Sequence, residues 1–484
     1  MDFWLILLVM FIIGTLMLSK TKAERHVLLF MIRTTRGISL MDKIAGISPR
    51  AWLFFADLAT VISFAGLGGM YVSKHRRMEP IIFVIGCMGL VVYSAKMGNV
   101  LASAVFLVLL SILANWKFNK PVFNTPQASF LVTFVIMALI MLQIFQPSTE
   151  GDFILPQEVH VLLAMLGGII GLPAILIGTL VFQGFMILTE KSETPGVSPA
   201  LPMVKDGELG LGFLGFDIFI PIWYAVTAII ILLVVHEYAH GILARVHNVR
   251  VKSSGLLTIG PVPIGAFVEP DEDELKKRPG VENMRISAVG SFANILTAFV
   301  FMSLLLFIVI PSYGEGLMVT GVINNTPAYG VIEEGTIIYE IDDKEVKNRL
   351  SVNIEPDQNI TLNTSKGIFV IETTEHPDDP GRGYIGILHV EHTKGFITPV
   401  MFISIVQLFY WIYFLNFAVG LVNLLPILPF DGGRMFSELM KMFKLSEENI
   451  TKIVYWVIAI VLLILLINVT PLFERLIELV SELL

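Results

Sequence analysis

The chain has 484 residues, of which 55% are hydrophobic and only 15% charged, and its mean hydropathy is +0.76. Soluble domains carry about 25% charged residues, so this composition excludes a soluble protein. Several uncharged runs reach the roughly 20 residues that cross a bilayer core, which indicates a polytopic membrane protein. The net charge of −8 without a basic block argues against nucleic-acid binding, and the single cysteine, Cys87, excludes an intrachain disulfide and a thiolate zinc site.

The apolar runs predict a polytopic α-helical membrane protein with about ten transmembrane helices. The first run lacks a basic n-region and a small-residue cleavage site, so we expect a retained first span rather than a removed signal peptide. We therefore expect a multi-pass protein of the cell membrane. The predicted spans are 2–18, 51–72, 80–95, 101–115, 128–146, 159–187, 217–244, 286–310, 401–428 and 453–471.

Lysine and arginine are concentrated in the loops 19–50 and 245–285 and in the loop after residue 428. An excess of positive charge marks cytoplasmic loops, and ten spans that start from an outside N-terminus place all three loops on that side. The basic stretch SKHRRME, 73–79, falls outside in this scheme, which leaves the topology of 51–158 open.

One segment, 314–395, contains no run long enough to span a membrane and carries more acidic than basic residues. Strand-like stretches such as LMVTGVI and GIFVIETT are separated by turn sequences such as NNTP and DDPGRG. This pattern predicts a small, mostly β soluble domain inserted between two spans.

The segment ILLVVHEYAHGILARVHNV, 231–249, places two imidazoles and a carboxylate in an apolar helix. In the pattern HExxH, His236 and His240 lie one turn apart on one face and can bind a single ion, usually zinc, while Glu237 can take a proton from a water that the ion activates. The alternative is a pair of core histidines, but ionisable groups inside a membrane are costly and usually functional. The other histidines, His247 included, lack ligand spacing and are expected in loops or at the surface.

Two histidines leave a zinc site in need of a third protein ligand. One source is the acidic stretch 269–274, in a loop expected to be cytoplasmic. The other is Asp431 in NLLPILPFDGGR, 423–434, where two prolines end a long uncharged helix and two glycines allow a sharp turn. Irregular backbone at membrane depth is tolerated where it is buried or lines a wet cavity, so Asp431 is suited to complete the site. The alternative for Asp431 is a helix cap.

With HEYAH in one span and NLLPILPFDGG in a later one, the sequence resembles the site-2 protease family of intramembrane zinc metalloproteases, peptidase family M50. The spacing of the family's NxxPxxxxDG pattern is kept from Asn423 to the aspartate, although the second proline comes three residues after the first rather than two. The resemblance implies one Zn2+ per chain. The implied metal ligands are His236, His240 and Asp431, and the implied general base and acid is Glu237.

The resemblance also divides the chain into four parts. These are an N-terminal transmembrane region of unassigned role, 1–190; the first half of the protease core with the HExxH helix and a β-hairpin loop, 191–313; the inserted domain, 314–395; and the second half of the core, 396–484. In the inserted domain, NTPAYGVIEEGTIIYEIDDKEV resembles part of a PDZ domain. A peptide ligand and a size filter or spacer are both compatible with it.

Three further positions are implied to bind substrate or support the transition state: Asn294, Asn423 and Gly265. GSFANI resembles the family's GPxxN motif, with Ser291 in place of proline, and the amide of Asn294 could hold the substrate carbonyl or the developing oxyanion. The alternative is a close helix–helix contact through small residues. PVPIGAFVEP, 261–270, resembles the family's β-hairpin beside the site, whose edge strand can pair with an unwound substrate; the alternative is an ordinary loop.

These patterns together predict an intramembrane zinc metalloendopeptidase that cleaves in or near a transmembrane segment of membrane-anchored proteins, as in regulated intramembrane proteolysis. Its partners would be transmembrane protein substrates and the lipid bilayer. Two alternatives remain. One is a zinc-binding, non-hydrolytic scaffold that presents the PDZ-like domain, against which the intact Glu237 argues. The other is a transporter, for which the few intramembrane charges, mainly Asp57, give little support.

Overall fold

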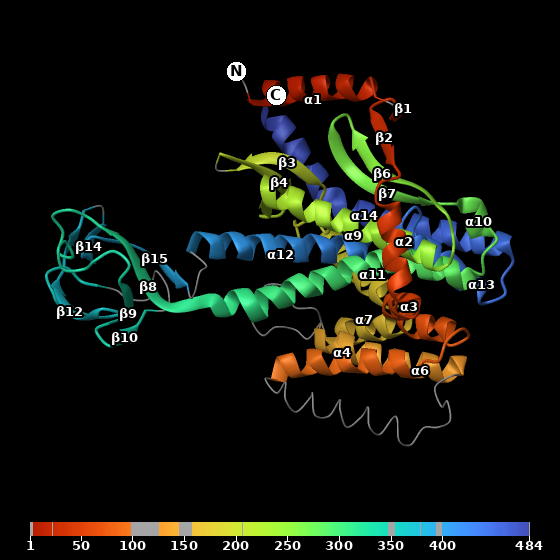
Figure 1. The fold of residues 1–484 in the computed structure, drawn as a ribbon, viewed down its shortest axis with the longest axis horizontal. Helices are drawn as coiled ribbons and strands as arrows, with labels where there is room; N and C mark the ends of the chain where they lie inside the picture. The colour runs from red at the N-terminus through yellow and green to blue at the C-terminus, as the bar shows by residue number, and fades with distance from the viewer. Residues whose placement is uncertain are drawn as a thin grey trace. The chain divides into compact units, whose positions relative to one another are not determined.

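The structure is a computed structural model that describes residues 3–21, 23–97, 125–144, 157–205, 207–346, 354–377, 379–393 and 399–483. The chain forms two compact units (Figure 1). Unit 1 comprises Met1–Ala298 and Phe414–Leu484, and unit 2 comprises Phe299–Tyr413. All of the predicted site residues belong to unit 1, so the site can be described within that unit.

Helices dominate because long apolar segments in lipid must satisfy their backbone groups internally. In the described part of the chain, five are long and apolar enough to cross a membrane: Pro49–Val72, Ile222–Val246, Gly280–Ser312, Met401–Val422 and Glu447–Arg475. Shorter apolar helices lie near the predicted spans 80–95, 128–146 and 159–187. The described residues therefore do not reach ten spans, and 101–115 lies outside them.

The helices are numbered along the chain. They are α1 (Phe3–Ser19), α2 (Ile38–Ile47), α3 (Pro49–Val72), α4 (Glu79–Met97), α6 (Pro126–Ile144), α7 (Gln157–Ile170), α8 (Leu172–Leu188), α9 (Ile222–Val246), α10 (Glu272–Lys276), α11 (Gly280–Leu304), α12 (Pro399–Val422), α13 (Asp431–Lys441) and α14 (Glu447–Leu483). A π-helical turn, η1 (Leu305–Val309), and a 3-10 turn, η2 (Ile310–Ser312), follow α11.

The predicted span 159–187 is two helices, α7 and α8, rather than one. Gly171 between them has a φ of 71°, a conformation that favours glycine, and Pro173 lies in the first turn of α8, where its missing N–H is tolerated. A Cβ at Gly171 would lie 2.2 Å from the carbonyl oxygen of Ser63. Helix α3 is itself non-helical at the next residue, Phe64, so the break in one helix packs against a kink in another.

The predicted hairpin is one part of a four-stranded antiparallel sheet with the order β1-β2-β6-β7. Residues 261–270 supply its last strand, β7, while β6 comes from the segment before them. The N-terminal strand β2 pairs along the other side of β6, from Leu29 opposite Ile259 to Thr34 opposite Ser254. In the described part of the chain, β7 is therefore an edge strand. The strands are β1 (Glu24–His26), β2 (Leu29–Thr34), β6 (Val251–Ile259) and β7 (Val262–Pro270).

A second antiparallel sheet of unit 1, with the order β3-β4-β5, immediately precedes α9. Its strands are β3 (Ala200–Lys205), β4 (Glu208–Phe213) and β5 (Phe219–Pro221). The last residue of β5, Pro221, is also the N-cap of α9, so the sheet fixes where the HExxH helix begins.

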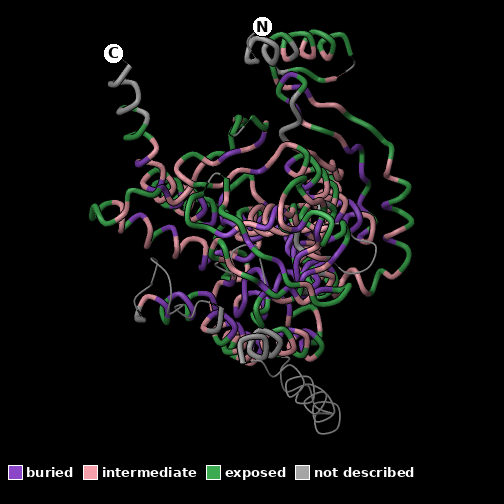
Figure 2. The backbone as a smooth tube through the Cα atoms, turned by 90° about the vertical axis from the view of Figure 1, so that its left-hand side faces the viewer, coloured by how far each residue is buried: buried purple, intermediate pink, exposed green. Residues whose placement is uncertain are grey.

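A buried ion cluster joins α3 to α11. Asp57 is 0% exposed, and its two carboxylate oxygens accept hydrogen bonds of 2.7 and 3.0 Å from the Arg285 guanidinium. Arg76, just after α3, donates a third at 3.1 Å. A buried carboxylate is tolerated only when it is paired in this way. Helix α3 is buried continuously from Ala56 to Gly66, while the described side chains of α1, at 9 and 11–19, are exposed or half-buried. Figure 2 shows buried residues in purple and exposed ones in green.

Unit 2 contains a six-stranded antiparallel sheet with the order β12-β11-β9-β8-β15, in which β10 also pairs with β9. Alternation along β11 buries Ile360 and Leu362 completely. This arrangement agrees with a β-rich insertion, and the PDZ-like topology stays a prediction. The strands are β8 (Tyr313–Val322), β9 (Ile337–Ile341), β10 (Lys344–Glu345), β11 (Asn359–Thr364), β12 (Gly367–Glu372), β13 (Thr374–His376), β14 (Asp379–Tyr384) and β15 (Ile387–Thr393).

Candidate metal centre

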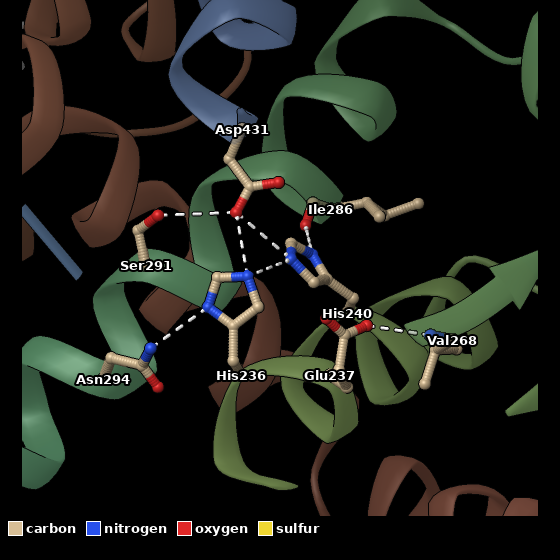
Figure 3. A network of polar contacts seen from close by, with 8 residues as sticks. All are labelled: His236, Glu237, His240, Val268, Ile286, Ser291, Asn294 and Asp431. Carbon is tan, nitrogen blue, oxygen red and sulfur yellow. Dashed lines mark hydrogen bonds and ion pairs between the residues drawn. The ribbon is translucent and has the colours of Figure 1, made fainter. Parts of the chain in front are cut away.

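Two histidines and an aspartate converge inside unit 1 (Figure 3). Helix α9 presents His236 and His240 one turn apart, with Nε2 atoms separated by 3.2 Å. Oδ2 of Asp431 lies 3.3 Å from Nε2 of His236 and 3.2 Å from Nε2 of His240. All three side chains are largely buried, with 11–13% of their surface exposed. The structure thus brings together the three residues that the sequence predicts as ligands.

Asp431 reaches this position through a tight loop between α12 and α13. The carbonyl of Asn423 accepts a hydrogen bond of 2.8 Å from the N–H of Gly432 and closes the loop. A Cβ at Gly432 would lie 2.1 Å from the carbonyl oxygen of Leu424, so the loop backbone packs directly on the start of α13. The glycine is therefore needed for close packing. Asp431 makes no side-chain cap for α13, whose N-cap residue is Phe430.

The three facing atoms fit a metal ion. Their separations of 3.2–3.3 Å match the distance of about 3.3 Å between two ligand atoms on a tetrahedral ion with bonds of about 2.0–2.1 Å. Nδ1 of His240 lies 2.6 Å from the carbonyl oxygen of Ile286. Because a carbonyl only accepts, Nδ1 carries the hydrogen, and in the neutral ring Nε2 then keeps its lone pair toward Asp431. A lone pair and a carboxylate oxygen this close repel unless a positive charge lies between them.

A glycine in α11 allows the His240 ring to lie close to the backbone of that helix. A Cβ at Gly290 would lie 2.2 Å from Nε2 and 2.6 Å from Cε1 of His240, so the imidazole packs against bare helix backbone at this glycine. Ile286, whose carbonyl binds the same ring, lies one turn earlier on the same helix. A helix–helix contact through small residues is the alternative interpretation of GSFANI, and in the structure the side chain next to Gly290 is that of His240, a candidate ligand.

The next residues of α11 contact the other two candidate ligands. Ser291 is fully buried, and its hydroxyl donates to Oδ2 of Asp431 across 3.4 Å. Asn294, also fully buried, places its amide nitrogen 3.2 Å from Nδ1 of His236. One helix therefore supports each of the three converging side chains, as Figure 3 shows. The serine is the position at which the sequence departs from the family motif, and here its hydroxyl makes a contact that proline could not.

The carboxylate of Glu237 lies between His240 and the edge strand β7 (Figure 3). Its Oε2 accepts a hydrogen bond of 2.8 Å from the backbone N–H of Val268. Val268 lies opposite Ser254 in the β6–β7 register. No side-chain pattern indicates such a contact, because the donor is a backbone group. It orients Glu237 beside the cluster and ties it to β7.

The other two predicted substrate-binding residues, Asn423 and Gly265, lie on segments next to the site. Asn423 acts through its backbone carbonyl in the loop before Asp431. Gly265 lies on β7, and a Cβ there would meet only Cβ of Leu257, at 3.9 Å, so packing within the sheet does not require a glycine. In the described part of the chain neither residue makes a hydrogen bond or ion pair with the three converging ligands, and their roles toward a substrate stay predictions.

The acidic stretch 269–274 is engaged elsewhere. Glu269 accepts a hydrogen bond of 2.6 Å from the Ser253 hydroxyl. Asp271 caps α10 and lies 3.2 Å from Nζ of Lys252. These contacts favour Asp431 over the nearer acids as the third ligand.

Two histidines predicted for loops or the surface are buried. His247 is 9% exposed because the chain after α9 folds back on α11, and His160 is 5% exposed within α7. Burial, followed by the nearby Arg285 and Arg278 guanidinium groups, lowers the pKa of His247 to about 4. The ring is therefore neutral at pH 7, and its contact of 3.5 Å with Glu282 is not an ion pair there.

Residues 224–466, half of the chain, match the family model of peptidase family M50. The chain is also 31% identical over 287 residues to the uncharacterized protein MJ0971 of Methanocaldococcus jannaschii, an alignment that covers 54% of this chain and 74% of that protein. The matched region contains α9, α11 and the start of α13, which supply the converging residues.

Proposed function

The chain belongs to peptidase family M50, a family of metallopeptidases, and from this we propose that it is an intramembrane zinc protease. The proposed reaction is hydrolysis of a peptide bond in or beside a transmembrane segment of a membrane-anchored protein. The observation that carries the proposal is the convergence of two imidazoles and a carboxylate at 3.2–3.3 Å, next to Glu237, within a membrane protein. Two histidines and one carboxylate form a typical catalytic zinc donor set that leaves a position open.

The proposed ligands of one zinc ion per chain are His236, His240 and Asp431. When bound, zinc would supply Lewis acidity toward the scissile carbonyl and toward an attacking water. Glu237 would take the proton from that water and deliver it to the leaving amine. The hydrogen bond from Val268 supports this role, because it fixes the orientation of the carboxylate before a substrate arrives.

A transmembrane helix hides its peptide bonds behind side chains and internal hydrogen bonds, so cleavage requires local unwinding. The edge strand β7 offers a partner for an unwound segment, because a peptide can add as a further strand to an exposed sheet edge. The hydrogen bond between Val268 of β7 and Glu237 would then align the substrate with the base. Gly265, on the same strand, has room around it for a close backbone approach.

Unit 2 supports a peptide-binding role for the inserted PDZ-like domain over that of a simple spacer. In the described part of this unit, β12 is a terminal strand of the sheet. Two of its apolar side chains, Ile368 and Val370, are 71% and 64% exposed. An exposed apolar edge strand favours pairing with another chain, so the domain would hold an extended part of the substrate.

The test compares the wild type with Glu237→Gln, both purified in detergent. The assays are zinc content per chain and cleavage of tagged single-span membrane proteins whose transmembrane helices carry glycine and asparagine, which favour unwinding. We expect about one zinc per chain in both proteins. Cleavage should fall about 10²–10⁴-fold in the variant, the usual contribution of a general acid–base group, and a chelator should abolish it in the wild type.

Glu448→Gln is the matched control, because the Glu448 side chain is 77% exposed at the start of α14 and, among the described residues, its ion pair is with its neighbour Lys452. It should cleave like the wild type. Zinc in every protein without cleavage of any substrate would favour the non-hydrolytic scaffold. Absence of zinc from the wild type would reject the metal centre itself.

A further inference from the structure

The side-chain amide of Asn294 places its nitrogen against a candidate zinc ligand, while its oxygen has no hydrogen-bond partner among the described residues. Its Nδ2 lies 3.2 Å from Nδ1 of His236, in a fully buried position. Its Oδ1 is buried and has no hydrogen-bond partner among the described residues. A buried polar atom left unpaired is destabilising, so this orientation does not satisfy the amide oxygen.

The tautomer of His236 decides which end of the amide can face it. If Nε2 binds zinc, as the proposed function requires, the ring hydrogen must be on Nδ1. An N–H group needs an acceptor, and Nδ2 of an asparagine is only a donor. The two ends of a primary amide exchange places by a half-turn about the Cβ–Cγ bond, and a structure assigns them by hydrogen bonding. The same half-turn places Oδ1 where Nδ1–H of His236 can donate to it.

We propose that Asn294 is a positioning residue for the metal, whose Oδ1 accepts a hydrogen bond from Nδ1–H of His236 and directs Nε2 toward zinc. The inference rests on the proposed zinc site. His240 provides the internal precedent, because its Nδ1 lies 2.6 Å from the carbonyl oxygen of Ile286 on the same helix. Both imidazoles are then held by an oxygen of α11, the arrangement that fixes orientation and raises basicity in other histidine metal sites.

In the exchanged orientation, we expect the amide nitrogen of Asn294 to find its acceptor within α11. An asparagine in a helix can donate to the carbonyl one turn earlier. Asn468 of α14, equally buried, makes this bond, with Nδ2 2.8 Å from the carbonyl oxygen of Ile464. Under this assignment the Asn294 amide is used within the protein, which distinguishes it from a group that waits for the substrate oxyanion.

The test measures zinc affinity of the full chain in detergent by competition with a chromophoric chelator, independently of any substrate. Asn294→Leu removes the acceptor with little change in size, and we expect zinc to bind about 10–100-fold more weakly. Asn294→Asp retains an acceptor oxygen, and we expect a much smaller loss of affinity than in the Leu variant. The matched control is Asn468→Leu, the same change at another fully buried position, which should leave zinc affinity unchanged.

Wild-type zinc affinity in Asn294→Leu would overturn the inference and favour a role for the Asn294 amide in substrate binding, while the zinc site would stand. Equal losses in the Leu and Asp variants would also overturn it, because packing rather than an acceptor would then matter. If the Leu variant does not fold, Asn294→Ala, which also removes the acceptor, replaces it: an affinity about 10–100-fold weaker supports the inference and wild-type affinity rejects it. A wild type that binds no zinc would reject the proposed function first, and this inference with it.

Discussion

Replacing Gly290 by alanine should displace a candidate metal ligand without removing any polar group. The new Cβ would lie 2.2 Å from Nε2 of His240, whereas nonbonded atoms rest about 3.5 Å apart. The imidazole would have to retreat by about 1.3 Å, several times the tolerance of about 0.2 Å in a metal–ligand distance. If α11 moved instead, Ser291 and Asn294 would move with it. Either response should weaken zinc binding by more than the 10–100-fold typical of an outer-shell change.

The assay is chelator competition on detergent-purified protein, with thermal unfolding measured in parallel because overpacking costs about 1–3 kcal/mol. Gly86→Ala is the control: it makes the same change in an apolar helix, α4, where a Cβ would meet nothing within 4 Å. The control should bind zinc normally. Normal zinc affinity in Gly290→Ala would refute the contact between His240 and the α11 backbone, and with it the view that α11 supports the metal site.

Two further substitutions test the surroundings of the centre. Ser291→Ala should weaken zinc binding by about tenfold, the low end for an outer-shell group, because the contact of the Ser291 hydroxyl with Asp431 is long at 3.4 Å. Chelator competition measures this loss, and an unchanged affinity would mean that Asp431 needs no hydroxyl. Asp57→Asn should lower the free energy of unfolding by about 3–5 kcal/mol, since it leaves the Arg285 charge buried without its partner. Thermal unfolding measures this loss, and a variant as stable as the wild type would show that the ion cluster is solvated.

Much of the site could be predicted because its pattern is local. The spacing of His236, Glu237 and His240 is read directly from helix periodicity. Asp431 is predicted from a different signal: two prolines end a helix and two glycines allow a sharp turn, which places a carboxylate on irregular backbone. The supporting contacts could not be predicted in the same way. The carbonyl of Ile286 and the N–H of Val268 are backbone groups that every residue carries, so only tertiary structure shows which of them matter.

The fold shows the same division between local and distant information. The apolar runs locate most helices, but the break at Gly171 depends on close packing against Ser63, more than one hundred positions earlier. The pairing of β2 with β6 joins residues 29–34 to 254–259. Nothing in the short sequence LFMIRT distinguishes a strand from the end of an apolar segment. Long-range pairing of this kind is decided by the partner rather than by the strand itself.

These distant contacts make β2 and Asp57 part of the structure that shapes the site. Strand β2 covers the outer side of β6, which leaves β7, the strand bonded to Glu237, as the edge beside the metal centre. Asp57 binds Arg285, the residue before Ile286, whose carbonyl holds His240. Both elements precede residue 224, where the match to the family model begins. A core cut at that boundary would expose the side of β6 and leave the Arg285 charge uncompensated, so the unit that forms the candidate metal site is larger than the segment that identifies the family.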